Sequence, residues 1–438
     1  MRKKGPSPIA KLPNSRWLIP GMGIKRWLLL LGFGALVAGM GFVYVILVLH
    51  RYNWLPEAMY RALTLQFLPV AWRIILPFVL GGGMMILAVY RLGHALLAPF
   101  RRPDEAVSES LYHYSRQGRG PHIVAIGGGT GMPSLLRGLR EYTRNITAVV
   151  TVADDGGSSG RLRRDLGLLP PGDFRNNIAA LSRDEALMTQ VLQYRFGAQV
   201  AERESAGNGR SELQGHAFGN LLLAALTGIT GSFDEALLAA ERVLGLRGRV
   251  LPSTLEPVTL VAEVLVAGQV QRVVGESAIP ESGGHIQHLC LEPEQVRAYP
   301  PVLKAILQAD LIVMGPGSLY TSILPNLLIH DLATALQHAR APKIYICNLA
   351  IQPGETDNYT VADHVDAILQ HLPTNFLDIV LANDNLSVPP QTGGGQTVYV
   401  QPVAPAAVRM MTADLVDEKR PWRHDSAKVA QAVISLLP

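Results

Sequence analysis

Two glycine-rich turns carry the first chemical signal in the sequence. The first follows the apolar run HIVAI and consists of Gly127, Gly128, Gly129, Thr130 and Gly131. The second follows DLIVM and contains Gly315, Gly317 and Ser318. Such turns aim backbone N–H groups and a helix N-terminus at an anion, and glycine permits its close approach. Two of them predict a ligand with more than one phosphate, or a phosphate donor facing an acceptor; a turn needed only for strand–helix packing is the alternative.

Acidic side chains follow the second predicted strand. Asp154 and Asp155 stand before a glycine–serine segment, where ligands bind folds of this kind. Their carboxylates suit a ribose hydroxyl or a hydrated magnesium ion, and a plain surface turn is the alternative. Asp173 adds a third carboxylate that supports them, unless it only caps a helix.

Polar side chains near these carboxylates complete the expected site. Arg175 would offset phosphate charge. Hydroxyl groups or a base would be read by amides, for which we select Asn177, Asn220 and Asn348. His216 and Asn220 are four residues apart, which predicts one helix face for both, although a lone histidine is more often a packing residue.

Two common nucleotide motifs are absent from the sequence. With Gly127 and Gly129 as the first two glycines of the dinucleotide fingerprint, Met132 stands where the third belongs. No GxxxxGK[ST] phosphate loop is present. We therefore do not favour a nicotinamide cofactor.

The elements that position these residues alternate between strand-like and helix-like segments. Apolar β-rich runs begin at HIVAI, ITAVVTVA, DLIVM, KIYICN and LDIVLAN, with helical stretches between them. This alternation predicts an α/β fold, a Rossmann-like parallel sheet with helices on both faces. Residues 183–248 read mostly as helix, broken near residues 228–232, and we expect them to form a helical cap.

The N-terminal part predicts a membrane anchor. Residues 27–49 contain no charged side chain, and residues 74–90 give a shorter run, so we expect two transmembrane helices. A cleaved signal peptide for the first run and an interfacial helix for the second are the alternatives. The basic residues favour both ends of this hairpin inside. We predict an anchor over 1–104, a linker over 105–120, and a domain over 121–438 facing the cytoplasm at the inner (plasma) membrane.

The distribution of charge excludes nucleic-acid binding. The net charge of the chain is +4, but residues 1–104 carry +11 and the remainder carries −7. The large domain therefore has no basic surface for a phosphate backbone. Two cysteines, Cys290 and Cys347, exclude a disulfide framework and indicate a reducing compartment.

Six ordered motifs resemble the gluconeogenesis factor family, relatives of 2-phospho-L-lactate transferase. They cover most of residues 121–388 and read GGGTGMPSLLRGL, TVADDGGSSGRLR, PPGDFRNNIAAL, GHAFGNLLLAAL, MGPGSLYTSILPNLL and CNLAIQPGETDNYTVADH. The resemblance implies a Rossmann-like fold, a role in cell shape and gluconeogenic growth, and binding of nucleotide sugars such as UDP-N-acetylglucosamine. The transferase relatives imply magnesium, held by carboxylates that resemble Asp155 and Asp173. The N-terminal hairpin departs from the usual soluble form of the family.

The leading hypothesis is a membrane-tethered, nucleotide-sugar-binding regulator of envelope precursor supply. Its expected partners are the ligand, the membrane, envelope-synthesis proteins and a second copy in a homodimer. A magnesium-dependent phosphoryl or nucleotidyl transferase is the enzymatic alternative, for which the sequence identifies no catalytic residue. An NAD-dependent oxidoreductase is the third hypothesis, and the missing third glycine argues against it.

Overall fold

The computed structural model describes residues 24–97, 120–197, 213–372, 376–387, 391–392, 395–396 and 398–437. The chain divides into two compact units, Met1–Arg116 and Gln117–Pro438. The predicted linker lies outside the described residues except for Gly120.

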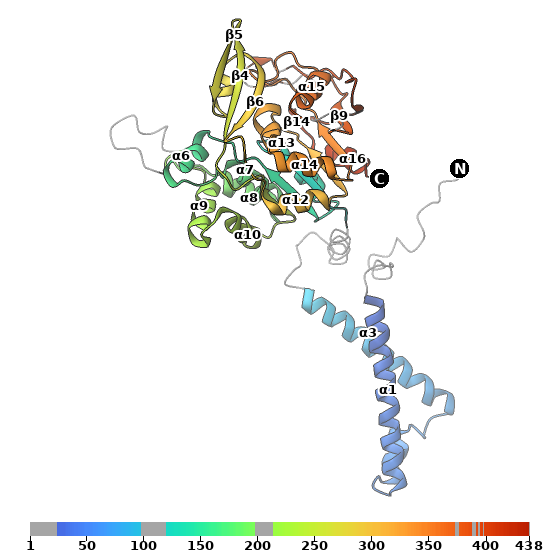
Figure 1. Cartoon of the computed structure of the whole chain (residues 1–438). Coiled ribbons are helices and arrows are strands. Elements are labelled where there is room, and N and C mark those ends of the chain that lie inside the picture. Colours follow the sequence, from blue (N-terminus) through green and yellow to red (C-terminus); the bar gives the residue numbers. More distant parts are fainter. Residues whose placement is uncertain are drawn as a thin grey trace, which may run out of the picture. The chain divides into compact units, whose positions relative to one another are not determined.

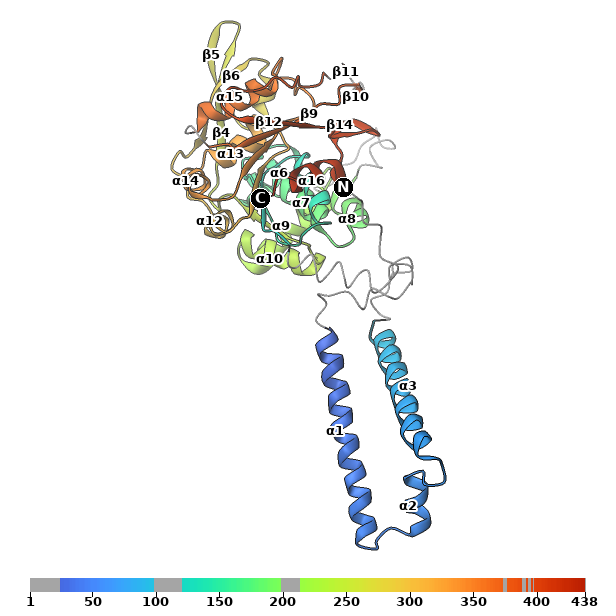
Figure 2. The same ribbon diagram turned by 90° about the vertical axis from the view of Figure 1, so that its right-hand side faces the viewer.

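Residues 24–97 of the N-terminal unit form three helices, α1 (Ile24–Arg51), α2 (Glu57–Leu63) and α3 (Val70–Leu97). Figure 2 shows α2 at the turn that joins the two long helices. Within α1, the 20 residues Gly32–Arg51 are long and apolar enough to cross a membrane, and side chains such as Phe33 and Met40 are largely exposed. One helix in this unit, as far as it is described, therefore meets the requirement for a span.

The second predicted span, 74–90, is not supported. The apolar part of α3 is Val70–Met85, which is shorter than a membrane-crossing helix needs. Arg73 lies near its start and donates hydrogen bonds to the carbonyl oxygens of Gln66 and Leu68, at 2.6 and 2.7 Å. The arginine therefore closes the turn between α2 and α3 instead of extending an apolar span.

A seven-stranded parallel sheet forms the centre of the second unit. Its strand order is β12–β9–β8–β7–β1–β2–β3. The strands are β1 (Ile123–Gly127), β2 (Ile146–Val150), β3 (Arg249–Pro252), β7 (Leu311–Met314), β8 (Lys343–Ile346), β9 (Ile379–Asn383) and β12 (Arg409–Ala413). The predicted parallel α/β sheet is confirmed, and the five predicted runs all form strands in it. The two edge strands, β3 and β12, were not predicted.

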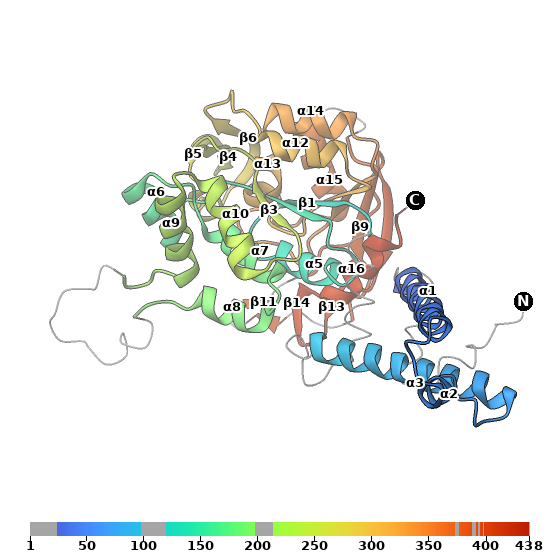
Figure 3. The same ribbon diagram turned by 90° about the horizontal axis from the view of Figure 1, so that it is seen from below.

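Helices cover both faces of this sheet. Figure 3 shows α5 (Met132–Leu139), α7 (Gly172–Leu181) and α16 (Ser426–Ile434) on one side. On the other side lie α12 (Pro300–Leu307), α13 (Leu324–Leu327), α14 (His330–His338) and α15 (Val361–His371). The strand residues between these layers are almost fully buried, as expected for a sheet covered on both faces.

Three helices lie in the described part of the predicted helical region, 183–197 and 213–248. They are α8 (Glu185–Gln193), α9 (Phe218–Thr230) and α10 (Phe233–Leu244), and the last two pack against each other. The break between α9 and α10 contains Gly231 at a φ of +87°, and the Ser232 hydroxyl caps α10. The predicted break near residues 228–232 is therefore confirmed.

A second, antiparallel sheet was not predicted from the sequence. It has the order β5–β4–β6, with β4 (Thr259–Val266), β5 (Gln269–Val274) and β6 (His285–Glu292), and short α11 (Ala278–Glu281) connects two of its strands. Figure 1 shows this sheet projecting beside the main one. We call β4, β5, α11 and β6 the small lobe.

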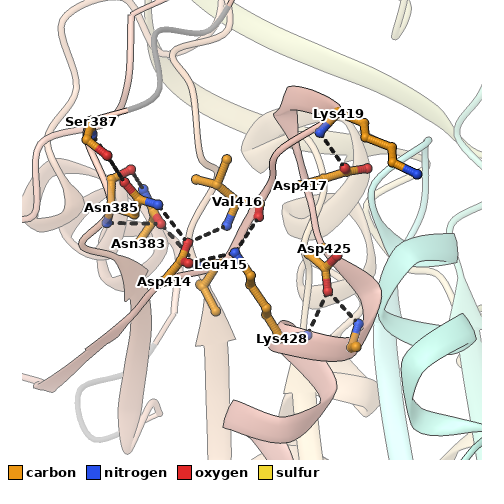
Figure 4. A network of polar contacts seen from close by, with 11 residues as sticks. Asn383, Asn385, Ser387, Asp414, Leu415, Val416, Asp417, Lys419, Asp425 and Lys428 are labelled. Carbon is orange, nitrogen blue, oxygen red and sulfur yellow. Dashed lines mark hydrogen bonds and ion pairs between the residues drawn. The ribbon is translucent and has the colours of Figure 1, made fainter.

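A polar network fixes the far edge of the main sheet, where β9 and β12 end (Figure 4). The Asn383 Oδ1 atom accepts from the Leu415 backbone N–H at 3.1 Å, and Lys428 Nζ contacts Asp414 at 2.6 Å. Asp425 caps α16 through two backbone N–H groups at 2.9 Å. This network joins the short antiparallel pair β13 (Val416–Asp417) and β14 (Arg420–His424) to α16. It gives the edge a structural role.

Candidate functional site

Both glycine turns lie at the point where the strand order of the main sheet reverses. The first follows β1 and the second follows β7, its neighbour in the sheet. The chain leaves β1 toward β2 on one side and reaches β7 on the other, so the loops diverge there. Folds of this class bind ligands in that crevice, outside the carboxyl ends of the strands.

The two turns pack directly on each other. A Cβ atom at Gly131 would lie 2.6 Å from the Pro316 carbonyl oxygen, so any side chain there would collide with the second turn. The Gly315 N–H donates to the Ile126 carbonyl oxygen at 2.8 Å. The structure thus brings the two predicted turns together.

Asp173 binds the first glycine turn. Its Oδ2 atom accepts a hydrogen bond from the Gly129 N–H at 2.6 Å, and a Cβ at Gly128 would meet the same oxygen at 2.6 Å. Desolvation is the main cause that raises the pKa of Asp173 to about 6, and the charge of Asp154 adds to it. One backbone donor predicted for phosphate is therefore already used by a carboxylate.

Asp154 lies beside Asp173 at the end of β2. The Gly156 N–H donates to its Oδ1 atom at 2.9 Å, and the Ser159 hydroxyl also binds it. Burial nevertheless raises the pKa of Asp154 above its ordinary value, because desolvation outweighs these hydrogen bonds. Asp154 and Asp173 are thus two desolvated carboxylates, and the charge of Asp154 disfavours ionisation of Asp173.

Asp155 holds the small lobe against the main sheet. Its carboxylate accepts hydrogen bonds from the backbone N–H groups of Glu276 and Ser277, both at 3.0 Å, and from the Ser277 hydroxyl at 2.7 Å. Behind it, a Cβ at Gly160 would lie 1.8 Å from the Asp155 carbonyl oxygen, so α6 (Gly157–Leu166) starts directly on this backbone. The part of the sequence expected to be a glycine loop is therefore the first turn of a helix.

Glu276 is a site residue that the sequence did not reveal. It enters from the small lobe, and its charge interacts with Asp154, Asp173, Asp155 and Glu355. Desolvation, followed by these four carboxylates, raises the pKa of Glu276 to about 8. A Rossmann-like pattern gives no signal for it, because the lobe is an insertion before β7.

Glu355 is the second residue that was missed. It is buried, and its carboxylate accepts from the hydroxyl of Ser318 and, at 3.4 Å, from that of Thr321. Burial raises the pKa of Glu355 in spite of these donors. Its place soon after the carboxyl end of β8 was a signal that could have identified it.

A buried cation borders the acidic side chains. Arg175 donates to Asn220 Oδ1 at 3.0 Å and to Asn176 Oδ1 at 3.1 Å, and its Nε atom has no hydrogen-bond partner. Burial raises the pKa values of Asp154 and Asp173, and the positive charge of Arg175 partly opposes this rise. The predicted pairing of Arg175 with phosphate stays a prediction.

The predicted amides occupy three different environments. Asn177 is fully buried, donates to the Asp173 carbonyl oxygen at 2.9 Å, and has no partner for Oδ1. Asn348 is half-buried at the end of β8 and donates to Gln352 at 2.8 Å. Asn220 is buried between Arg175 and Ser158. Their expected contacts with hydroxyl groups or a base stay predictions.

His216 lies before α9 and not on it. The chain turns at Gly215, with a φ of +79°, and α9 begins at Phe218. The prediction of one shared helix face is therefore wrong, although His216 and Asn220 both bind Ser158, at 3.0 Å each. Ser158 was not singled out in the sequence.

The expectation that Asp155 and Asp173 hold magnesium stays a prediction. Mg²⁺ usually keeps several waters and binds one or two carboxylates together with substrate phosphates, which Asp155 and Asp173 could supply. Within the described part of the chain, no group of three or more His, Cys, Asp or Glu side chains is arranged to hold a metal by itself. A cation here would therefore depend on the ligand for part of its coordination.

Comparison with known proteins identifies the family. Residues 123–431 match the family model described as 2-phospho-L-lactate transferase CofD. The chain is 44% identical to the gluconeogenesis factor of Bacillus subtilis, covering 73% of this chain and 99% of that protein. It is 41% identical to the gluconeogenesis factor of Listeria monocytogenes, covering 73% of this chain and 96% of that protein.

Solved structures agree with this result. A crystal structure of a member of the UPF0052 family from Bacillus halodurans has a TM-score of 0.63 to this chain and 40% sequence identity. The match covers 71% of this chain and 99% of that protein, so the α/β unit is complete as a separate protein in the relative. The chain belongs to the gluconeogenesis factor family, within the larger family of CofD-like proteins.

Proposed function

We propose that the protein binds a nucleotide sugar similar to UDP-N-acetylglucosamine and thereby regulates cell shape and the supply of envelope precursors during gluconeogenic growth. The observation that supports this proposal is the meeting of two glycine turns at the switch point of the sheet. Two such turns offer backbone N–H groups to both phosphates of a diphosphate. The membership of the gluconeogenesis factor family supports the physiological part.

The charges around the turns suggest how a diphosphate would be accommodated. The carboxylates of Asp154 and Asp173 would repel it, whereas Arg175 and the first turn of α6 offer positive potential. Magnesium bound to Asp155 and Asp173 would neutralise the repulsion and hold the phosphate oxygens. We therefore expect magnesium to strengthen nucleotide-sugar binding.

Substitution of Asp173 by Asn tests the site. The variant keeps the size of the side chain and an oxygen for the Gly129 N–H, but it removes the charge that magnesium needs. We expect the affinity for UDP-N-acetylglucosamine with magnesium to fall at least about tenfold in a calorimetric titration. The control is Asp366→Asn, which removes an exposed carboxylate on α15. Equal affinity in both variants would contradict the assigned site.

A transferase is the second candidate function, because the matching family model describes 2-phospho-L-lactate transferase. In that case the two turns would present a donor and an acceptor, and the carboxylates would hold magnesium at the transferred group. Incubation with a panel of nucleotide-activated donors and chromatography of the products distinguishes the two. Product formation supports the transferase, and binding without turnover supports the regulator.

We further propose that α1 anchors the protein in the plasma membrane with the α/β unit in the cytoplasm. The apolar length of Gly32–Arg51 and its exposed side chains support a lipid-facing helix. A gluconeogenesis-factor relative in Deinococcus radiodurans matches 96% of this chain at 38% identity, so its likeness extends to the N-terminal unit. Anchoring would hold the nucleotide-sugar site near envelope-synthesis proteins.

A further inference from the structure

Four buried polar side chains form one continuous chain of hydrogen bonds beside the site. Arg175 Nη1 contacts Asn220 Oδ1, Asn220 Nδ2 contacts Ser158 Oγ, and Ser158 Oγ contacts His216 Nδ1. Each of the three distances is 3.0 Å. Each of the four residues is at most 9% exposed to solvent, so bulk water alone cannot supply the hydrogen bonds that their polar groups need.

The chemistry of the groups fixes the direction of every hydrogen bond in this chain. A guanidinium can only donate, so Asn220 must turn its oxygen to Arg175 and its NH₂ group to Ser158. The Ser158 hydroxyl, which accepts from Asn220, has no other acceptor than His216 Nδ1 among the described residues. Its proton therefore points at that nitrogen. In a neutral imidazole that accepts at Nδ1, the ring proton is on Nε2.

The surroundings keep the ring neutral. Burial, with the nearby charge of Arg161, lowers the pKa of His216 below its ordinary value. A second positive charge beside Arg161 would be repelled. A neutral N–H donor avoids that repulsion.

The second ring nitrogen of His216, Nε2, is the one left for a ligand. It has no hydrogen-bond partner among the described residues. Ser158 stands in the first turn of α6, whose free N–H groups favour an anionic oxygen. Its neighbour Ser159 binds Asp154, so the chain of hydrogen bonds borders the acidic side of the site.

We propose that His216 donates a hydrogen bond from a neutral Nε2–H group to a phosphoryl oxygen of the bound ligand. In this proposal Ser158, Asn220 and Arg175 are positioning residues that fix the tautomer of the ring. The proposal rests on the proposed function for the identity of the ligand. The direction of the hydrogen bonds does not depend on it.

Nitrogen NMR of the separate α/β unit, Gln117–Pro438, tests the tautomer. The crystallised relative covers this unit alone, so it is expected to fold without the anchor. We expect the ring nitrogens of His216, assigned with His216→Gln, to show a protonated Nε2 and an unprotonated Nδ1 at pH 7.5. A protonated Nδ1 in the wild type would overturn the proposal.

Asn220→Asp should reverse the tautomer. The new carboxylate accepts from Arg175 and also from the Ser158 hydroxyl, so that Ser158 Oγ can only accept from the ring. The proton then moves to Nδ1 of His216. The matched control is Asn176→Asp, which adds the same charge beside Arg175 without touching Ser158. An unchanged tautomer in Asn220→Asp, or the same change of tautomer in the control, would overturn the proposed chain of hydrogen bonds.

Two probes separate the role of the histidine from the identity of the ligand. UDP-N-acetylglucosamine and inorganic pyrophosphate, each with magnesium, should shift the Nε2 resonance of His216. His216→Gln keeps an amide donor near the Nε2 position and should bind within about threefold of wild type, whereas His216→Asn should lose about tenfold.

The outcomes have distinct meanings. A shift with pyrophosphate alone, without UDP-N-acetylglucosamine binding, would support the histidine donor and reject the proposed nucleotide sugar. Binding of either probe with an unmoved Nε2 resonance would overturn the further inference, as would the binding of neither.

Discussion

Five carboxylates share the ligand-binding edge of the sheet, contributed by Asp154, Asp155, Asp173, Glu276 and Glu355. Their mutual repulsion is offset in two ways. Asp155 accepts three hydrogen bonds from the small lobe, and Glu276, with a pKa of about 8, holds a proton at neutral pH. Protonation of Glu276 therefore removes one of the five negative charges from this edge.

Glu276→Gln should change the pH dependence of stability. The folded-state pKa of Glu276 is about 8 against an ordinary value of 4.5, so its contribution is fully present below pH 4.5 and is lost as the pH rises through 8. The side chain of the variant is neutral at every pH, so it causes no such loss of stability as the pH rises. We expect its free energy of unfolding to exceed that of wild type at pH 9 by about 1–3 kcal/mol, and to equal it below pH 4.5, in urea titrations.

The exposed Glu281 on α11 supplies the matched control. Glu281→Gln removes a charge from the same lobe without entering the acidic cluster. If the free energy of unfolding of both variants depended on pH in the same way as that of wild type, the burial of Glu276 among the carboxylates would be contradicted.

The sequence identified Asp154 and Asp173 because each stands beside a strand end or glycine segment. It missed Glu276 for a physical reason. This glutamate reaches the site only through the fold of the small lobe, and the hydrogen bonds of Asp155 that bring it there link residues more than a hundred positions apart.

At the scale of elements, the site depends on close contact between the first glycine turn and the start of α7. A Cβ at Gly128 would lie 2.6 Å from Asp173 Oδ2 and 2.8 Å from Thr151 Cγ2. Neither neighbour can retreat easily, because both are packed at the end of the sheet. The glycine at this position is therefore required by space.

Gly128→Ala should displace Asp173 and weaken magnesium-dependent ligand binding at least about tenfold. Gly156→Ala is the control, since its Cβ would meet only Asp154 Oδ1, at an ordinary 3.5 Å. Calorimetric titration of both variants with UDP-N-acetylglucosamine measures the difference. Full affinity in Gly128→Ala would show that the turn adapts and would refute this explanation.

The main sheet was predictable because its strands are short apolar runs bounded by glycine or polar residues. The small lobe was not, because β5 has mostly exposed, mixed residues and its pairing with β4 depends on a turn at Ala267 and Gly268, both with positive φ. Its role in the site appears only when the two sheets are seen together (Figure 1).

At the scale of the whole molecule, the N-terminal unit bears on which side of the membrane the α/β unit occupies. Five basic residues precede α1 and two more stand in its first turn, and this charge favours a cytoplasmic N-terminus. With a single span, however, a cytoplasmic α/β unit requires the N-terminus on the opposite side of the membrane. The proposed ligand requires the cytoplasmic side, where nucleotide sugars are made. Sidedness is therefore a strict test of the proposal.

Protease protection in membrane vesicles measures the side of the membrane on which the α/β unit lies. We expect the full chain to remain in the membrane fraction at high salt, because apolar burial of α1 does not depend on charge. We expect the α/β unit to be digested in inside-out vesicles and protected in right-side-out vesicles. The reverse pattern would exclude a cytoplasmic nucleotide-sugar site.

The most direct measurement is isothermal titration of Gln117–Pro438 with UDP-N-acetylglucosamine, UDP-glucose, GDP and NAD, each with and without magnesium. We predict selective binding of a UDP-sugar with an affinity on the order of micromolar, strengthened by magnesium, and no turnover. Preference for GDP with an absolute requirement for magnesium would contradict the regulator and favour the transferase.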